Sequence, residues 1–234
     1  MTIAKIISSG ASGAEQAALD IAIRLEVPYA GFTMPDTMMD RYRTTRRYKL
    51  HEKQFRSSRS KDEANLHIAD ATLIFTHGKL SRDLWFVDDY AVSHGHPSLH
   101  IDLDKHAPLK AAFDISIWTD IHSPRSLFVT GSREEDDKRI YQDVYDTMFS
   151  VLTLGKDKSP EQVDPPAREG AALPQTVDDA VEHLIELLPL KDKVFIANMD
   201  ALEVADLNYS LGSFVRNFFG LWSGNEKLWW SCTK

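Results

Sequence analysis

Residues 3–15 read IAKIISSGASGAE, a short apolar run that passes through a glycine turn into a helical pattern. The β-branched run Ile3–Ser8 is typical of a strand, and Gly10 and Gly13 delimit the turn that follows it. From Gly13 to Glu26, alanines and aliphatic residues recur at helical spacing. The stretch therefore predicts a strand, a glycine turn and a helix in direct succession, which is how many α/β domains begin.

The same alternation of short apolar runs and helical patterns continues to about residue 155. Strands are predicted at residues 27–32, 71–76, 98–102 and 127–131, and helices at residues 61–68, 82–94, 109–121 and 136–154. For residues 109–121 a strand stays possible, because three isoleucines are spaced closely there. Continuous apolar strands between helices are typical of a parallel sheet covered on both faces. We therefore predict an α/β fold with a Rossmann-like parallel sheet and helices on both of its faces.

The composition of the chain changes after this region. Residues 156–173 contain three prolines and many charges but almost no large apolar side chains, which indicates a linker. From Pro174 onward the pattern is helical, with Thr176 as the expected cap of a first helix and further helices from about Leu190 and Asp200. We predict a Rossmann-like domain at residues 1–155 and a small all-α domain at residues 174–234. The second is too small to bury much by itself, so we expect it to dock on the first domain or on another subunit.

Composition excludes several classes of protein. No apolar run approaches the about 20 residues that cross a bilayer, and the N-terminus lacks the pattern of a signal peptide. One cysteine, Cys232, allows neither an internal disulfide nor a cysteine-rich metal cluster. The net charge of −8 argues against general nucleic-acid binding. We therefore expect a cytoplasmic protein with no membrane or nucleic-acid partner.

Positive charge is concentrated in residues 41–61. Nine basic residues stand there against one acid, Glu52, which gives this segment a charge of +8. Six of the nine are arginines, whose guanidinium groups suit phosphate oxygens. An anionic ligand or a partner surface would explain this concentration, and so would a solvated loop. Four arginines are candidates for neutralising a phosphate: Arg41, Arg43, Arg46 and Arg47.

Three strand-to-helix junctions are candidates for ligand binding, at residues 10–14, 78–82 and 131–133. The carboxyl ends of parallel strands meet at one sheet edge, so the junctions should converge there. At the first, glycines permit close approach of a ligand, and the first turn of the helix presents unpaired N–H groups to an anion. Ser12 either adds a hydroxyl donor or caps the helix in a capping box with Glu15.

Cationic side chains accompany the other two junctions. Arg133 either contacts a ligand or pairs with the acids that follow it, while Lys79 and Arg82 either reach a ligand or lie in an exposed loop. The candidate binding residues are Gly10, Ala11, Ser12, Gly13, Ala14, Arg41, Arg43, Arg46, Arg47, Gly78, Lys79, Gly131, Ser132 and Arg133. No metal site is indicated, because His94 and His96 lack a carboxylate or thiolate at ligand spacing, and no catalytic nucleophile stands out.

Several collinear segments resemble the molybdenum carrier family. They are KIISSGASGAEQAALD (5–20), VPYAG (27–31), YKLHE (48–52), NLHIADATLIF (65–75), HGHPSLHIDL (94–103) and VTGSR (129–133). The resemblance implies a Rossmann-like fold related to the lysine-decarboxylase-like nucleotide-binding proteins. It also implies a homo-oligomer that binds the molybdenum cofactor, a pterin phosphate, or a nucleotide-like ligand.

The chain departs from this family at two glycine loops. The family has Gly-Gly-Gln-Thr-Gly where this chain has Ser9–Gly13, and an aspartate–arginine pair where it has Glu15-Gln16. A second glycine pair, expected near Ser81–Asp83, is missing, and in related phosphoribohydrolases a glycine-rich loop and a glutamate on that side carry catalysis. The C-terminal part resembles a small helical domain of unknown function.

Three functions stay open at this point. The leading one is a binding or carrier protein for a small anionic ligand, a phosphate-bearing cofactor or nucleotide, at the strand edge. The second is a nucleotide hydrolase, for which the sequence offers Asp83, Asp88 or Asp89 as the catalytic acid. The third is an interaction module that has lost its ligand site and binds a protein partner through exposed aromatic anchors. Those anchors would be Trp222, Trp229 and Trp230.

Overall fold

The computed structural model describes residues 3–35, 47–154, 173–188, 190–199, 204, 211–221 and 224–233. The chain divides into two compact units, Met1–Gly155 and Lys156–Lys234. The predicted linker lies almost wholly outside the described residues, as do Arg41, Arg43, Arg46 and Trp222.

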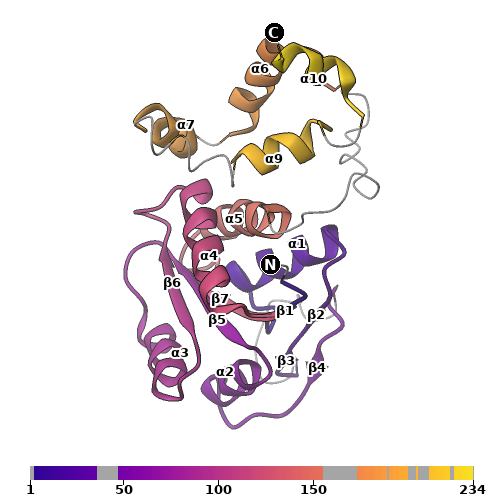
Figure 1. Cartoon of the computed structure of the whole chain (residues 1–234). Coiled ribbons are helices and arrows are strands. Elements are labelled where there is room, and N and C mark those ends of the chain that lie inside the picture. The colour runs from indigo at the N-terminus through magenta and orange to yellow at the C-terminus, as the bar shows by residue number, and fades with distance from the viewer. Residues whose placement is uncertain are drawn as a thin grey trace. The chain divides into compact units, whose positions relative to one another are not determined.

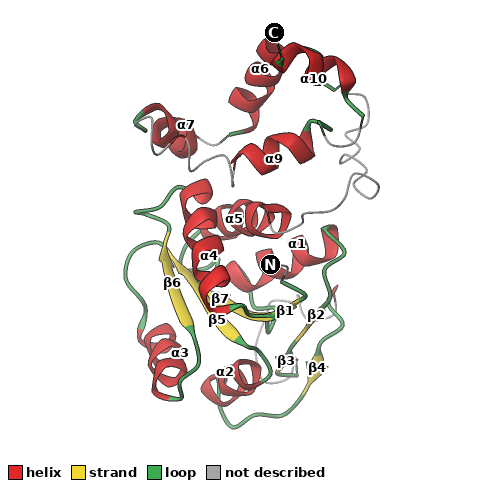
Figure 2. Cartoon of the chain, in the orientation of Figure 1, coloured by secondary structure: helices red, strands yellow, loops and turns green. Residues whose placement is uncertain are grey.

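A five-stranded parallel sheet forms the centre of the first unit (Figure 2). Its strands, in spatial order, are β2 (Tyr29–Ala30), β1 (Lys5–Ile7), β7 (Ser126–Gly131), β5 (Ala71–Thr76) and β6 (Ser98–Asp102). Every neighbouring pair is parallel, and the register sets Ile6 opposite Leu127. All residues of β5 are buried, as expected for a central strand covered on both faces. The prediction of a parallel Rossmann-like sheet is confirmed.

Helices cover both faces of this sheet (Figure 1). On one side lie α1 (Ala14–Arg24), α4 (Pro108–His122) and α5 (Ile140–Leu154), and on the other lie α2 (Ser58–His67) and α3 (Arg82–Ser93). Successive side chains of a strand point to opposite faces, so the two faces have separate cores. Ile6 packs with α1 and α5 residues in one core, whereas Ile7 packs with α2 and α3 residues in the other.

The structure corrects two predicted element boundaries. The strand expected at residues 27–32 is interrupted, and β3 (Phe32–Thr33) pairs with β4 (His51–Glu52) in a separate two-stranded sheet. The break falls at Gly31, where a Cβ atom would lie 1.9 Å from the carbonyl oxygen of Ser8. Helix α5 begins at Ile140 rather than near residue 136, because Asp136 and Asp137 form a turn on the carbonyl of Arg133. Residues 108–122 are helical, which settles the choice left open there.

The second unit is helical where it is described. Its helices are α6 (Val177–Leu187), α7 (Leu190–Ala197), α9 (Leu211–Phe218) and α10 (Glu226–Cys232). Thr176 caps α6 in a capping box with Asp179, as the predicted cap required. Of the helix expected from residue 200, the structure describes Val204, which is helical, and then α9 from Leu211. Trp229 and Trp230 are exposed, and no described helix of the chain is long and apolar enough to cross a membrane.

Gly131 provides a test of the packing at the end of β7. A Cβ atom there would lie 2.2 Å from the carbonyl oxygen of Phe75, a rigid backbone group. We expect Gly131→Ala to lower the free energy of unfolding by about 3 kcal/mol or more. The control is Gly95→Ala, which meets no atom within 4 Å and should cost only about 1 kcal/mol for its positive φ. Urea unfolding measures both, and equal losses would contradict the close approach of β5 and β7.

Candidate functional site

The three predicted junctions converge at the carboxyl edge of the sheet. The Ala14 N–H donates to the carbonyl of Ser132 at 3.2 Å, and the Ser132 N–H donates to the carbonyl of Phe75 at 2.9 Å. A Cβ atom at Gly13 would lie 2.6 Å from the same Ser132 oxygen. The turn at residues 10–13 therefore lies against the loop at residues 131–133, and both lie beside the end of β5. The predicted convergence is confirmed.

The start of α1 differs from the capping box considered for it. The N-cap residue is Gly13, with a φ of 83°, and no side chain caps the helix. Ser12 instead donates its hydroxyl to Oε2 of Glu135 at 2.5 Å, and this bond lowers the pKa of Glu135. The Glu15 carboxylate turns back and accepts a hydrogen bond from the Ala11 N–H at 3.0 Å. The alternative that Ser12 caps the helix is therefore wrong, because the N-cap position is taken by Gly13, which has a positive φ and no side chain.

The backbone N–H groups at this turn divide into two sets. Those of Ala11 and Ala14 are engaged by Glu15 and Ser132. None of the described residues accepts a hydrogen bond from the N–H groups of Ser12, Gly13 or Glu15. Gly13 and Glu15 are buried, and buried N–H groups in proteins are almost always paired. The turn therefore holds three N–H donors suited to an external acceptor.

A buried polar network lies beneath the turn. The Lys61 ammonium donates to Oγ of Ser9 at 2.6 Å and pairs with Oδ1 of Asp62 at 3.0 Å. The Ser9 hydroxyl in turn donates a hydrogen bond to the carboxylate of Glu15, which also accepts one from Oγ1 of Thr130 at 2.9 Å. The hydroxyl of Ser9 thus bridges a buried ammonium and a buried carboxylate. The network joins α1, α2, the end of β1 and the end of β7.

Electrostatics keep both main groups of this network charged. Burial acts to raise the pKa of Glu15, but the Lys61 charge and hydrogen bonds from Ser9, Ala11 and Thr130 outweigh it and hold that pKa below its usual value. Burial acts to lower the pKa of Lys61, but the charges of Glu15 and Asp62 raise it. Both groups are therefore ionised at neutral pH.

Asp62 is the titratable member of the group. Burial is the largest influence on it, and together with the charge of Glu15 it raises the pKa of Asp62 to about 6, against the lowering influence of Lys61 and Arg133. Its protonation therefore changes within the range of physiological pH.

The burial of Lys61 was not foreseen from the sequence, which grouped it with the basic residues 41–61. Helix α2 has few apolar residues, so polar side chains such as Lys61 and Asn65 must fill its buried face. Asn65 exchanges two hydrogen bonds with the backbone of Phe32, at 2.7 and 3.0 Å. The shortage of apolar residues in residues 58–67 was the signal that could have revealed this.

The predicted cationic contacts have different surroundings. Arg133 is exposed, and its positive charge contributes to the lowered pKa of Glu135, one of the acids that follow it. Arg47 pairs with the buried Asp20 at 3.2 Å. The hydroxyls of Tyr48 and Tyr141 donate to the same carboxylate, and burial together with these bonds raises the pKa of both tyrosines.

At the junction after β5, a backbone N–H group that could meet a ligand already has an acceptor within the chain. The Gly78 N–H donates to Oδ1 of Asp102 at 2.7 Å, while Lys79 is exposed. At the position where the resemblance led us to expect a second glycine pair, Ser81 is the N-cap of α3 and accepts a hydrogen bond from the Leu84 N–H. An ordinary capped helix thus stands in place of a second glycine loop.

The acids considered for catalysis lie on α3. Asp83 is within 3.9 Å of Arg59, Asp88 accepts a hydrogen bond from Ser98 at 2.7 Å, and Asp89 is exposed. No observation on these carboxylates distinguishes any of them as a catalytic acid.

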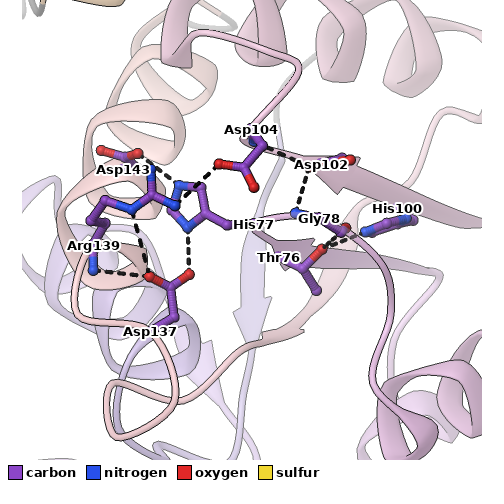
Figure 3. A network of polar contacts seen from close by, with 9 residues as sticks. All are labelled: Thr76, His77, Gly78, His100, Asp102, Asp104, Asp137, Arg139 and Asp143. Atoms are coloured by element: carbon purple, nitrogen blue, oxygen red, sulfur yellow. Dashed lines mark hydrogen bonds and ion pairs between the residues drawn. The ribbon is translucent and has the colours of Figure 1, made fainter.

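His77, which the sequence analysis did not single out, is the centre of a second network (Figure 3). Its Nδ1 contacts the Asp137 carboxylate, and its Nε2 lies 2.9 Å from Oδ2 of Asp143. The guanidinium of Arg139 extends the network, because it lies 3.1 Å from Oδ1 of Asp104. The imidazole is 4% exposed, so it is shielded from any ligand. The contacts of His77 with Asp137 and Asp143 join the loop and helix after β7 to the end of β5.

The donor and the acceptor of the neighbouring hydrogen bond between Thr76 and His100 can be assigned. Thr76 donates its hydroxyl to the carbonyl of Gly78 at 2.7 Å, so it accepts from Nε2 of His100, also at 2.7 Å. Burial lowers the pKa of His100, which keeps the ring neutral. His100 is thus a half-buried part of the structure. In the part of the chain that the structure describes, no group of three or more His, Cys, Asp or Glu residues is placed to hold a metal ion.

Comparison with known proteins agrees with this fold. A family model described as the circularly permutated YpsA SLOG family matches residues 6–152, and a domain of unknown function, DUF6794, matches residues 173–229. The crystal structure of a putative molybdenum carrier protein from Syntrophus aciditrophicus SB is similar over 64% of this chain and 95% of that chain, with 34% identity and a TM-score of 0.59. No curated protein matches the chain.

Glu15 offers a first test of the buried network. We expect Glu15→Gln to lower the free energy of unfolding by about 3 kcal/mol, because the Lys61 ammonium stays buried without its main compensating charge. The matched control is Glu26→Gln, an exposed glutamate just beyond the same helix, which should change stability by less than about 0.5 kcal/mol. Chemical denaturation measures both variants. A loss no larger than that of the control would contradict the network.

The raised pKa of Asp62 makes a second prediction. In the unfolded chain this carboxyl titrates near 3.8, and in the folded protein near 6, so the folded state binds the proton more tightly between these values. Ionisation over this range therefore lowers the free energy of unfolding. We expect the stability of Asp62→Asn relative to the wild type to increase as the pH rises from about 4 to about 6. Denaturation at several pH values, with Asp89→Asn as control, measures this, and a constant difference would contradict it.

Proposed function

The chain belongs to the circularly permutated YpsA SLOG family, and on that basis we propose that it binds a phosphate-bearing cofactor or nucleotide at the carboxyl edge of the sheet. The observation that carries the proposal is the set of three N–H groups, those of Ser12, Gly13 and Glu15, that have no acceptor among the described residues. N–H groups at the start of a helix, together with the helix dipole, favour an anion. The similarity to a protein named as a molybdenum carrier supports a carrier role.

Charge at the turn decides how strongly a phosphate binds there. The positive charge of Lys61 is balanced by Glu15 and Asp62 beneath the turn. Glu135, held by Ser12, is a carboxylate that the phosphate must approach. Arg133 is an exposed guanidinium on the adjoining loop, and a charge-assisted bond from it would offset that repulsion. The affinity is therefore expected to depend on Arg133.

The donor set also indicates how the molybdenum cofactor would be held. Backbone N–H groups and a guanidinium suit a phosphate group, which the pterin cofactor and nucleotides share. The described residues contain no cluster of metal ligands. We therefore propose that either type of ligand is held through its phosphate and not through bonds from protein side chains to a metal.

Arg133 provides the direct test. We expect inorganic phosphate and adenosine monophosphate to raise the Tm of the wild type, and Arg133→Ala to weaken their binding about tenfold through the loss of a charge-assisted bond. The matched control is Arg125→Ala, because Arg125 lies just before the amino end of the same strand, at the opposite edge of the sheet. Thermal shift over a range of ligand concentrations gives both affinities. Equal losses in the two variants, or none in Arg133→Ala, would overturn the placement of the site.

The identity of the ligand is tested by native purification of the full chain, followed by mass spectrometry and metal analysis. We expect a phosphate-bearing pterin or a nucleotide to be retained by the protein. Protein that is free of ligand and whose Tm does not respond to nucleotides, pterins or molybdate would overturn the proposed function.

A further inference from the structure

The charges of the polar network beneath the glycine turn do not balance. Its cation is the Lys61 ammonium, which lies 3.0 Å from Oδ1 of Asp62. The same ammonium donates to Oγ of Ser9 at 2.6 Å, and the Ser9 hydroxyl bonds to the second acid, Glu15. With both acids ionised, two carboxylates share one ammonium, and the network carries one excess negative charge.

This excess charge lies close to the proposed phosphate. The Glu15 carboxylate holds the N–H of Ala11, and the N–H of Glu15 itself is one of the three donors of the turn that have no acceptor among the described residues. The charges of Glu15 and Arg133 both act on Asp62, so that carboxyl is within electrostatic reach of the two segments that form the site. An anion bound there is repelled by the network unless one carboxylate takes up a proton.

Asp62 is the carboxyl suited to take up this proton. Glu15 keeps its charge, because Lys61 and three hydrogen bonds hold its pKa low. The side chain of Asp62 is 15% exposed, so water reaches it, and burial already raises its pKa to about 6. A bound phosphate raises that pKa further in two ways. Its negative charge disfavours the carboxylate, and it offsets the charge of Arg133, which acts to lower the pKa.

Other ionisable groups also interact with α2. From α3 and the segment after it, these are Asp83, Tyr90 and His96. The first lies 3.9 Å from Arg59, and the other two interact with His67. Neither residue of β3 is ionisable. The titration of Asp62 therefore depends mainly on the ammonium, the carboxylate and the guanidinium named above.

We propose that the binding of a phosphate at the glycine turn is coupled to the uptake of a proton by Asp62. This inference rests on the proposed function and adds a regulation to it. At low pH, Asp62 already carries the proton and the affinity is highest. As the pH rises from the pKa of the free protein to that of the complex, each pH unit lowers the affinity by at most about tenfold. A carrier built in this way holds its ligand more tightly as the pH falls.

The test uses sulfate as the probe, because sulfate stays a dianion over this pH range whereas a phosphate group itself titrates near pH 6. By calorimetry on the full chain, we expect the wild type to bind sulfate about tenfold more weakly at about pH 7.5 than at about pH 5.5. At about pH 6.5, titrations in two buffers of different ionisation enthalpy should show an uptake of about half a proton for each sulfate bound.

Asp62→Asn assigns the proton to this residue. Asparagine keeps the shape of the carboxyl without its charge, so the affinity of the variant for sulfate should not change with pH. It should equal that of the wild type at about pH 5.5, with no proton uptake. The matched control is Asp89→Asn, an exposed aspartate on α3, which should retain the pH dependence and the proton uptake of the wild type.

The outcomes separate this inference from the site on which it rests. Sulfate binding by the wild type with no pH dependence and no proton uptake would overturn the coupling and leave the anion site standing. This measurement needs no variant, so it decides the matter even if Asp62→Asn does not fold. A pH dependence that persists in Asp62→Asn would overturn the role of Asp62. Failure of the wild type to bind sulfate at every pH would overturn both proposals.

Discussion

The buried charge pair of Lys61 and Glu15, bridged by the hydroxyl of Ser9, is the interaction on which the carboxyl edge of the sheet depends. It joins α2 to α1, and through Ser9 and Thr130 it reaches the ends of β1 and β7. Burying two charges is costly, and apolar replacements in other proteins are often as stable. Its contribution here is geometric, because Glu15 takes the N–H of Ala11 and thereby decides which donors of the turn stay free. The proposed function follows from that division.

A second constraint acts on the other side of β7. His77 lies between two carboxylates from the segment that follows β7, so the loop that carries Arg133 is fastened to the end of β5. Beyond it, Ser81 caps α3 at the position where the resemblance led us to expect a second glycine pair. The edge therefore has one glycine turn instead of two. This asymmetry is consistent with a single phosphate position at the turn.

Much of the fold could be predicted from the sequence because its signals are local. The apolar run Ile3–Ser8 and the glycine turn after it indicated a parallel sheet and the convergence of its junctions. The partners of individual side chains could not be predicted, because they depend on residues far apart in the chain. Lys61 and Ser9 are separated by 52 positions, and Ser12 and Glu135 by 123. Burial of Lys61 also reverses the usual expectation for a lysine in a basic segment.

The central claim is that the N–H groups of Ser12, Gly13 and Glu15 receive a phosphate. The most direct measurement is a titration of the ¹⁵N-labelled protein with inorganic phosphate, followed by the amide resonances of residues 11–15. We predict saturable shifts for Ser12, Gly13 and Glu15, and much smaller ones for Ala11 and Ala14, whose N–H groups already have acceptors within the protein. Shifts confined to the basic residues 49–59, or none among the three donors, would contradict it.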